Sequence, residues 1–121
     1  MEKQHALQQL EQLQKKLYAI HYACSAMNLD ADTVAPKNTS EGRGVALGVL
    51  AGEEQQLMIC PETRALLDEL DRQKDELDLL HRREVEELRR RCDQLTRIPA
   101  EEYIAYSELV NKAGDVWHKA K

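Results

Sequence analysis

Residues 10–27, LEQLQKKLYAIHYACSAM, decide the fold class of this 121-residue chain. Their apolar positions are separated alternately by three and four residues: Leu10, Leu13, Leu17, Ile20, Cys24 and Met27. Because an α-helix has 3.6 residues per turn, this spacing puts these side chains on one side of a helix. We predict a helix over about residues 3–27 that packs in a bundle, since the seam is too short for a coiled coil and its flanks lack the charge pattern of one.

The composition also favours an all-α protein. Leu and Ala, both strong helix formers, occur 17 and 13 times, whereas Gly and Pro together number eight, too few for the frequent turns of an all-β fold. The net charge of −5 argues against a nucleic-acid or anionic-membrane surface, because phosphate binding requires a concentrated positive field. No stretch approaches the roughly 18 apolar residues of a membrane-spanning helix. We therefore expect a single helical domain over residues 1–121, located in the cytoplasm.

Three prolines divide the remaining sequence. Residues 28–40 have no helical period and contain Pro36, which predicts one long loop between the first two helices. Pro61 and Pro99, each followed by glutamate within two residues, mark the starts of further helices. Residues 61–97 fit either one long helix or a hairpin in which an aspartate near residue 78 caps a second helix. The prediction is an antiparallel bundle of four or five helices.

Glycine recurs at every fourth residue at the start of the second predicted helix, at Gly44, Gly48 and Gly52. Each glycine inside a helix costs about 1 kcal/mol relative to alanine, so three on one face predict that another helix packs closely against bare backbone there. The pattern is not a phosphate-binding loop, because it lacks the Gly-Lys-Ser/Thr ending and a preceding strand.

Metal-binding and redox patterns are weak in this sequence. The odd number of cysteines without Cys-x-x-Cys spacing predicts buried free thiols: Cys24, Cys60 and Cys92. No His-Glu-x-x-His occurs, and His81 with Glu84 one helical turn later is only a remote candidate for a metal site. Residues 30–41 have the length of a calcium loop, but Ala35 stands where its sharp turn requires glycine. The residues alone predict no catalytic site, no metal site and no cofactor.

Short motifs follow one another along the chain in a characteristic order. They are Asp30-x-x-Thr33-x-x-Pro36, Glu41-Gly42-Arg43-Gly44-x-x-Leu47-Gly48-x-Leu50, Pro61-Glu62 before Leu66-Leu67, Glu84-Val85-x-x-Leu88-x-x-x-Cys92-Asp93, Ile98-Pro99-x-Glu101, Ser107-x-Leu109, and Ala113-x-x-Val116-Trp117-x-x-Ala120-Lys121. In order and spacing they resemble the N-terminal region of the carboxypeptidase Taq family. Members of this family are helical zinc metallocarboxypeptidases that remove C-terminal residues from peptides.

The resemblance implies that this chain covers or lines one wall of the substrate cleft of a mostly helical enzyme. The family's zinc site, His-Glu-x-x-His with a downstream glutamate, is not in this sequence, so no catalytic or metal residue is carried over. Zinc or another divalent metal is expected only in the full-length enzyme. The implied partners are the remainder of the peptidase chain and a peptide substrate, and a homodimer is a further possibility.

Two positions depart from the family pattern. Leu29 stands where the family usually has a tryptophan before the aspartate that matches Asp30, and Lys37 replaces a second proline. The contacts that the tryptophan makes in the family must therefore differ here.

Three polar residues near the long loop are the candidates for lining the cleft: Asp30, Thr33 and Arg43. Their simpler roles are local capping for Asp30 and Thr33 and a surface ion pair for Arg43. Trp117 lies near the end of the last predicted helix, after which no stop signal follows, which favours a piece of a longer protein. Trp117 is then expected to be the docking face to the missing region.

The alternative is a stand-alone helical protein-interaction module. Such a module would bind a partner helix through the seam of residues 10–27 or through the glycine face of residues 44–52. Trp117 separates the two hypotheses. It should be buried in a complete small module, but exposed or held in an oligomer contact in a segment of a larger enzyme.

Overall fold

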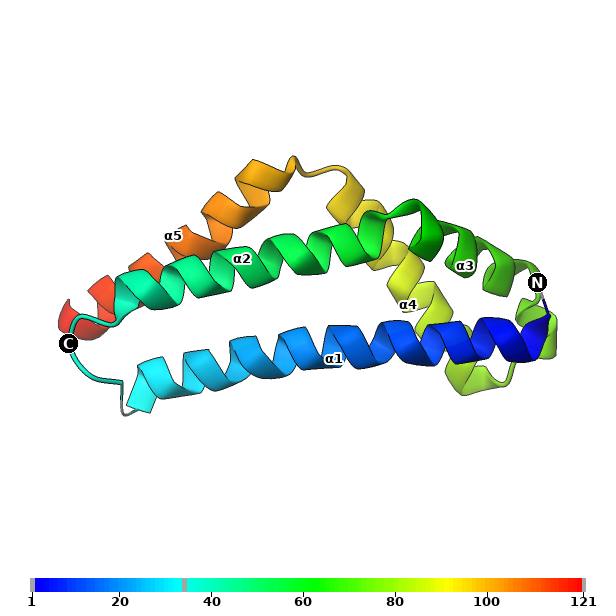
Figure 1. Cartoon of the computed structure of the whole chain (residues 1–121), viewed down its shortest axis with the longest axis horizontal. Coiled ribbons are helices and arrows are strands. Elements are labelled where there is room, and N and C mark those ends of the chain that lie inside the picture. Colours follow the sequence, from blue (N-terminus) through cyan, green and yellow to red (C-terminus); the bar gives the residue numbers. More distant parts are fainter. Residues whose placement is uncertain (1, 34, 121) are drawn as a thin grey trace. The chain divides into compact units, whose positions relative to one another are not determined.

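The computed structural model describes residues 2–33 and 35–120, and every regular element in these residues is a helix (Figure 1). The elements are α1 (Lys3–Thr33), α2 (Ser40–Ile59), α3 (Pro61–Arg72), the short 3₁₀ helix η1 (Lys74–Glu76), α4 (Leu79–Thr96) and α5 (Ala100–Ala120). The all-α fold predicted from composition and periodicity is confirmed. None of the described helices is long and apolar enough to cross a membrane.

The first helix is longer than its sequence pattern predicts. α1 continues to Thr33, so the first part of the loop predicted over residues 28–40 is helical, and that prediction was wrong. Asn and Asp favour turns here, but local hydrogen bonds hold the end of the helix. The Thr33 hydroxyl donates to the Leu29 carbonyl at 2.6 Å, and the Ala35 N–H donates to the carbonyl of Asp30 at 2.8 Å.

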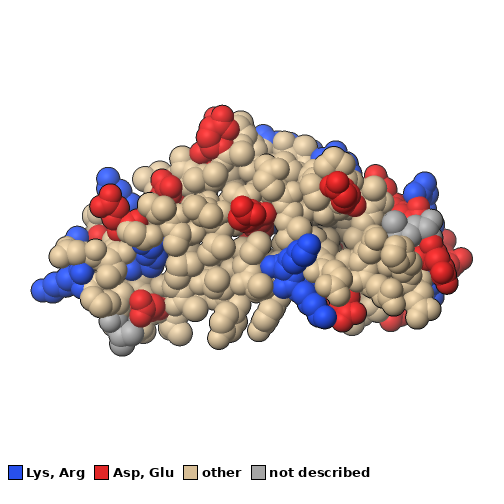
Figure 2. All heavy atoms as spheres, in the orientation of Figure 1, with Lys and Arg blue, Asp and Glu red and all other residues tan. Residues whose placement is uncertain are grey.

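The second half of α1 is unusual in its lack of charge. Between Lys16 and Asp30 it carries no Lys, Arg, Asp or Glu, and Figure 2 shows a correspondingly uncharged stretch of surface along this helix. Tyr18 and Tyr22, one helical turn apart, are 68% and 65% exposed, and their ring centroids lie 6.0 Å apart.

The open choice within residues 61–97 is resolved in favour of two helices. α3 ends at Arg72, and α4 begins after Asp78, whose side chain accepts a hydrogen bond from the His81 backbone N–H at 2.9 Å. This is an N-cap, which satisfies one of the amide groups that the first helical turn leaves without a partner. α3 and α4 contact each other as a hairpin.

The described residues fall into two compact units, and α1 and α2 each contribute to both. Unit 1 contains residues 2–17 and 55–98, and unit 2 contains residues 18–54 and 99–120. Unit 1 has an aliphatic core, built from Ala6, Leu10, Leu13, Leu17, Met58, Leu66, Leu67, Leu70, Leu77, Val85, Cys92 and Leu95. The first half of the predicted seam on α1 therefore does bury its leucines.

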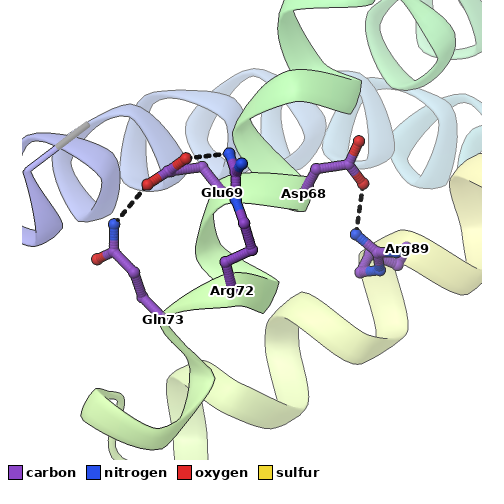
Figure 3. A network of polar contacts seen from close by, with 5 residues as sticks. All are labelled: Asp68, Glu69, Arg72, Gln73 and Arg89. Carbon is purple, nitrogen blue, oxygen red and sulfur yellow. Dashed lines mark hydrogen bonds and ion pairs between the residues drawn. The ribbon is translucent and has the colours of Figure 1, made fainter.

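Polar contacts on unit 1 connect and cap its helices (Figure 3). Asp68 of α3 pairs with Arg89 of α4 at 2.6 Å. Glu69 accepts hydrogen bonds from Arg72 and, at 2.8 Å, from the Gln73 amide. The Gln73 hydrogen bond and the Arg72 charge lower the pKa of Glu69, although partial burial opposes them.

Unit 2 differs from unit 1 because it buries few apolar side chains. Leu47 is its one large apolar side chain in the described core, and no residue of α5 is buried. Its exposed large apolar side chains are Tyr18, Tyr22, Leu29, Val45, Val49, Tyr106, Leu109, Val110, Val116 and Trp117. Polar contacts and close backbone approach must therefore contribute much of what holds its helices together.

Candidate functional site

Unit 2 contains a groove of about 620 Å³. Its walls come from α1, α2 and α5, and its polar lining includes Asn28, Asp32, Arg43, Glu54, Tyr103 and His118. A volume of this size falls within the range of sites that bind small molecules.

A buried carboxylate lies in the wall of this groove. Glu54 of α2 is 8% exposed, and its Oε2 lies 3.0 Å from Nε2 of His21 on α1. The Tyr103 hydroxyl of α5 donates to Glu54 Oε1 at 3.4 Å. Glu54 therefore joins all three helices of unit 2, since a buried carboxylate is stable only when donors surround it.

The one thiol beside Glu54 is not set up as a nucleophile. Burial, together with the negative charge of Glu54, raises the pKa of Cys24, so the thiol stays protonated. All three cysteines are free, as predicted, but Cys24 and Cys60 are only half-buried, and Cys92 alone is buried.

A second polar cluster links α2 to α5 further along the groove. Arg43 Nε donates to Asn111 Oδ1 at 2.9 Å, and Arg43 Nη1 donates to the Thr39 hydroxyl at 3.3 Å. The Asn111 amide in turn donates to the Ser40 carbonyl at 2.8 Å. Arg43 is thus oriented by neutral groups, where its sequence context suggested a surface ion pair.

A third contact joins α5 to the end of α1. His118 Nε2 lies 2.8 Å from Asp32 Oδ1, and both residues line the groove. This contact holds the last turn of α1, the turn that the sequence pattern assigned to a loop.

The glycines of α2 lie where α5 passes over it. A Cβ added at Gly48 would be 2.9 Å from Glu108 Oε1 and 3.2 Å from Ile104 Cγ2. At Gly52 it would be 3.0 Å from Ile104 Cδ1, and at Gly44 it would be 3.0 Å from Asn111 Nδ2. A Cβ at these positions would therefore require side chains of α5 to shift.

The candidates predicted from sequence lie in different places. Arg43 lines the groove, but Asp30 and Thr33 are not among its lining residues. Both are exposed, and Thr33 uses its hydroxyl on the Leu29 carbonyl. The hydrogen bond of Thr33 is therefore local, within the end of α1, as its residue type suggested.

Sequence reasoning missed His21, Glu54, Tyr103 and Asn111. They lie on three helices, far apart in sequence, so no spacing connects them. One signal was available: Glu54 follows Leu47 by seven residues and precedes Met58 by four, which places an acidic residue on the buried face of α2. An acid at such a position indicates a buried polar contact.

The described residues do not offer a ligand set for a catalytic metal. They contain no group of three or more His, Cys, Asp or Glu side chains that could hold an ion. His81, the remote candidate, uses its Nδ1 on Asp78 at 2.8 Å and so belongs to the N-cap of α4. The polar side chains that line the groove of unit 2 offer hydrogen-bond donors and acceptors.

Comparison with known proteins places the chain in a family. The model of the carboxypeptidase Taq (M32) metallopeptidases matches residues 9–121. Carboxypeptidase 1 of Bacillus subtilis (strain 168) is 32% identical over 103 residues, which make up 84% of this chain. The chain spans 21% of the length of that relative. No solved structure matches this chain. This chain belongs to the carboxypeptidase Taq family of metallopeptidases.

Proposed function

We propose that this chain is the N-terminal helical part of a metal-dependent carboxypeptidase, and that it shapes the substrate cleft without carrying out the chemistry. The observation that carries the proposal is the match itself, which covers 84% of this chain but only 21% of Carboxypeptidase 1. A segment of that size cannot hold all the functions of a peptidase of the relative's length. The sequence also contains no His-Glu-x-x-His, the zinc motif that the family resemblance implies.

The groove of unit 2 is the part of this chain that we assign to the cleft. Arg43 lines it, and Asn111 and Thr39 fix the direction of the guanidinium group. Arginine is suited to contact the carbonyl and carboxylate oxygens of a peptide because it presents several N–H donors in one plane. Glu54, Tyr103 and His21 keep the walls of the groove in place.

The metal, zinc or another divalent ion, would be held by the remainder of the peptidase. There it would polarise the scissile carbonyl and lower the pKa of a bound water molecule. The described residues of this chain do not fit such a site, so their part is limited to binding and orienting the peptide. The free thiols support a reducing location such as the cytoplasm.

The second candidate is the stand-alone helical interaction module. The exposed apolar side chains of unit 2 favour a docking role of some kind, since they are numerous for so small a unit. The 58% exposure of Trp117, however, supports the segment of a larger enzyme over a complete module with Trp117 in its core. We therefore assign the face that carries Trp117 to contact with the remainder of a peptidase chain.

Metal binding and peptide hydrolysis by the purified chain test this assignment. Equilibrium dialysis against zinc should detect no tight stoichiometric site, and incubation with zinc and a blocked dipeptide should release no C-terminal amino acid. One equivalent of tightly bound zinc, or metal-dependent release of amino acids, would show that the chain is catalytic by itself and would overturn the proposal.

A further inference from the structure

The groove of unit 2 opens into a second hollow at the end where α2 begins. This hollow has a volume of about 450 Å³ and shares four lining residues with the groove: Ala31, Arg43, Asp115 and His118. The rest of its lining comes from residues 35–40 and Lys119. We call this part of unit 2 the basic end of the groove, because Lys37, Arg43, His118 and Lys119 all line it.

The acidic side chains at the basic end already have partners. Asp115 pairs with Lys119 at 3.1 Å, one helical turn further along α5. Asp32, which lines the adjoining groove, lies 2.8 Å from Nε2 of His118. These two carboxylates therefore do not balance the other charges of the basic end.

Two cations at the basic end are left without a carboxylate. Neither Arg43 nor Lys37 pairs with an acid among the described residues, and Lys37 is exposed. Glu41, the acid nearest to Arg43 in sequence, lines a different hollow. The basic end therefore offers two uncompensated positive charges to a ligand, in a chain whose net charge is −5.

Arg43 is also held in place before any ligand binds. Its Nε donates to Asn111 Oδ1 at 2.9 Å and its Nη1 donates to the Thr39 hydroxyl at 3.3 Å. Its Nη2 donates to no described residue, so these N–H groups remain for a ligand. A guanidinium oriented by neutral groups keeps its full charge and loses little conformational freedom on binding.

The other end of the groove has the opposite charge. Glu54, which is 8% exposed, lies eleven residues after Arg43, so the two lie on the same face of α2, about 16 Å apart along the helix axis. Leu47 and Ala51 line the groove between them. The charges at the two ends therefore attract a carboxylate to Arg43 and repel it from Glu54.

We propose that the basic end of the groove is a subsite for a carboxylate of a bound peptide, with Arg43 as its oriented donor and Lys37 as a second cation. The carboxylate is the C-terminal group of the peptide or the side chain of an aspartate or glutamate. Arginine binds carboxylates through charge-assisted hydrogen bonds, which are stronger than those between neutral groups. The inference rests on the proposed function for its class of ligand, a peptide, and adds the chemical group that the groove selects.

NMR titration of the isotope-labelled chain with three acetylated pentapeptides tests the proposal. The first is pentaalanine with a free C-terminal carboxylate, the second is the same peptide ending in an amide, and the third is that amide with aspartate at its centre. A peptide with a carboxylate should bind at least about fivefold more tightly than the neutral amide and should shift the signals around Arg43. If neither carboxylate peptide binds more tightly than the neutral amide, the proposal is wrong.

The same titration identifies the source of the carboxylate. Tighter binding of the free acid assigns the subsite to the C-terminus of the peptide, and tighter binding of the aspartate peptide assigns it to an acidic side chain. Inorganic phosphate is the competing anion. If phosphate alone binds to the same residues more tightly than both carboxylate peptides, the subsite is not selective for a carboxylate and the proposal is overturned.

Variants of the two cations locate the subsite. Lys37→Gln and Arg43→Gln should each weaken binding of the better carboxylate peptide about fivefold or more and leave binding of the neutral amide unchanged. Lys37 makes no contact that holds the fold, so its variant remains informative if circular dichroism shows that Arg43→Gln loses helix. Lys16→Gln is the matched control, because it removes the same charge from an exposed position outside the groove. Equal weakening by all three variants would reduce the effect to net charge and overturn the subsite.

Failure of this inference is distinguishable from failure of the proposed function. If all three peptides bind in the groove equally well, the carboxylate subsite is wrong, but the assignment of the groove to the cleft stands. Tight zinc binding or hydrolysis by the chain would overturn the proposed function and would leave the measured preference for a carboxylate unchanged.

Discussion

Among single residues, Gln55 shows how a polar side chain can hold a helix end inside a core. It is 1% exposed, and its amide nitrogen donates to the carbonyls of Leu95 and Ile98, at 3.1 Å and 2.7 Å. Leu95 lies in the last turn of α4, where a helix leaves carbonyls short of donors, and Ile98 follows the end of the helix. Gln55 therefore fastens the end of α4 to α2 within unit 1.

Replacement of this amide should destabilise the protein without changing its shape. Gln55→Met keeps the length of the side chain but removes a donor from both carbonyls, although the Leu95 carbonyl keeps the Ile98 N–H at 3.2 Å, so it should lower the free energy of unfolding by about 1 kcal/mol. Gln56→Met, at the exposed neighbouring position, should change it by less than about 0.5 kcal/mol. Urea unfolding measures both free energies. Equal losses of stability in the two variants would contradict the role of the Gln55 amide.

Asp78 makes stability depend on pH. The hydrogen bonds from the backbone and side chain of His81 hold the pKa of the Asp78 carboxyl below its ordinary value. A carboxylate with a lowered folded pKa adds stability above its unfolded pKa, and that stability is lost as the pH falls through the folded value.

The matched variant is Asp78→Asn, because asparagine also caps helices but carries no charge. The free energy of unfolding of the wild type should fall more steeply below about pH 4 than that of Asp78→Asn. Parallel pH profiles for the two proteins would show that the cap carries no charge-dependent stability.

The sequence alone predicted the roles of Asp78 and Gln55 to different degrees. The aspartates before α4 were recognised as possible caps, because an N-cap is a local feature of the sequence. Gln55 was not recognised, since its partners lie 40 and 43 residues away and become neighbours only in the folded chain. The same reason hid the contact between His21 and Glu54.

Whole helices were predicted more reliably than their ends. The apolar period predicted the body of α1, but the helix continues through residues 28–33, where a contact from α5 to Asp32 overrides the local preference for a turn. For α5, the sequence left open whether Trp117 is buried, and the structure exposes it by 58%. The sequence could not predict that Ile104 and Asn111 are among the residues that meet α2.

Close packing of α2 and α5 predicts different effects on stability when two glycines are replaced by alanine. Gly114→Ala adds a Cβ that meets nothing within 4 Å, so the higher helix propensity of alanine should stabilise the protein by up to about 1 kcal/mol. Gly48→Ala adds a Cβ that is 2.9 Å from Glu108 Oε1 and 3.2 Å from Ile104 Cγ2, which should cancel or reverse that gain. Thermal unfolding of the two variants checks this difference. An equal gain in stability would mean that α5 does not pack closely against Gly48.

The whole molecule combines one well-packed unit with one that buries little. Unit 1 has the leucine-rich core expected of a stable helical protein, whereas unit 2 exposes most of its large apolar side chains and joins its helices through Glu54, Asn111 and His118. Such a unit is suited to a wall of a cleft that gains partners from a larger assembly. This is the role that we propose for the chain within the family, whose model matches residues 9–121.

The central claim is that this chain supplies the cleft wall of a metal-dependent carboxypeptidase. The most direct test replaces the aligned segment of Carboxypeptidase 1 with this chain and measures release of C-terminal amino acids. We predict an active enzyme in which Arg43→Ala raises KM with little change in kcat, whereas Arg83→Ala, at an exposed position of α4, changes neither. A folded, metal-loaded exchange enzyme without activity would contradict the claim.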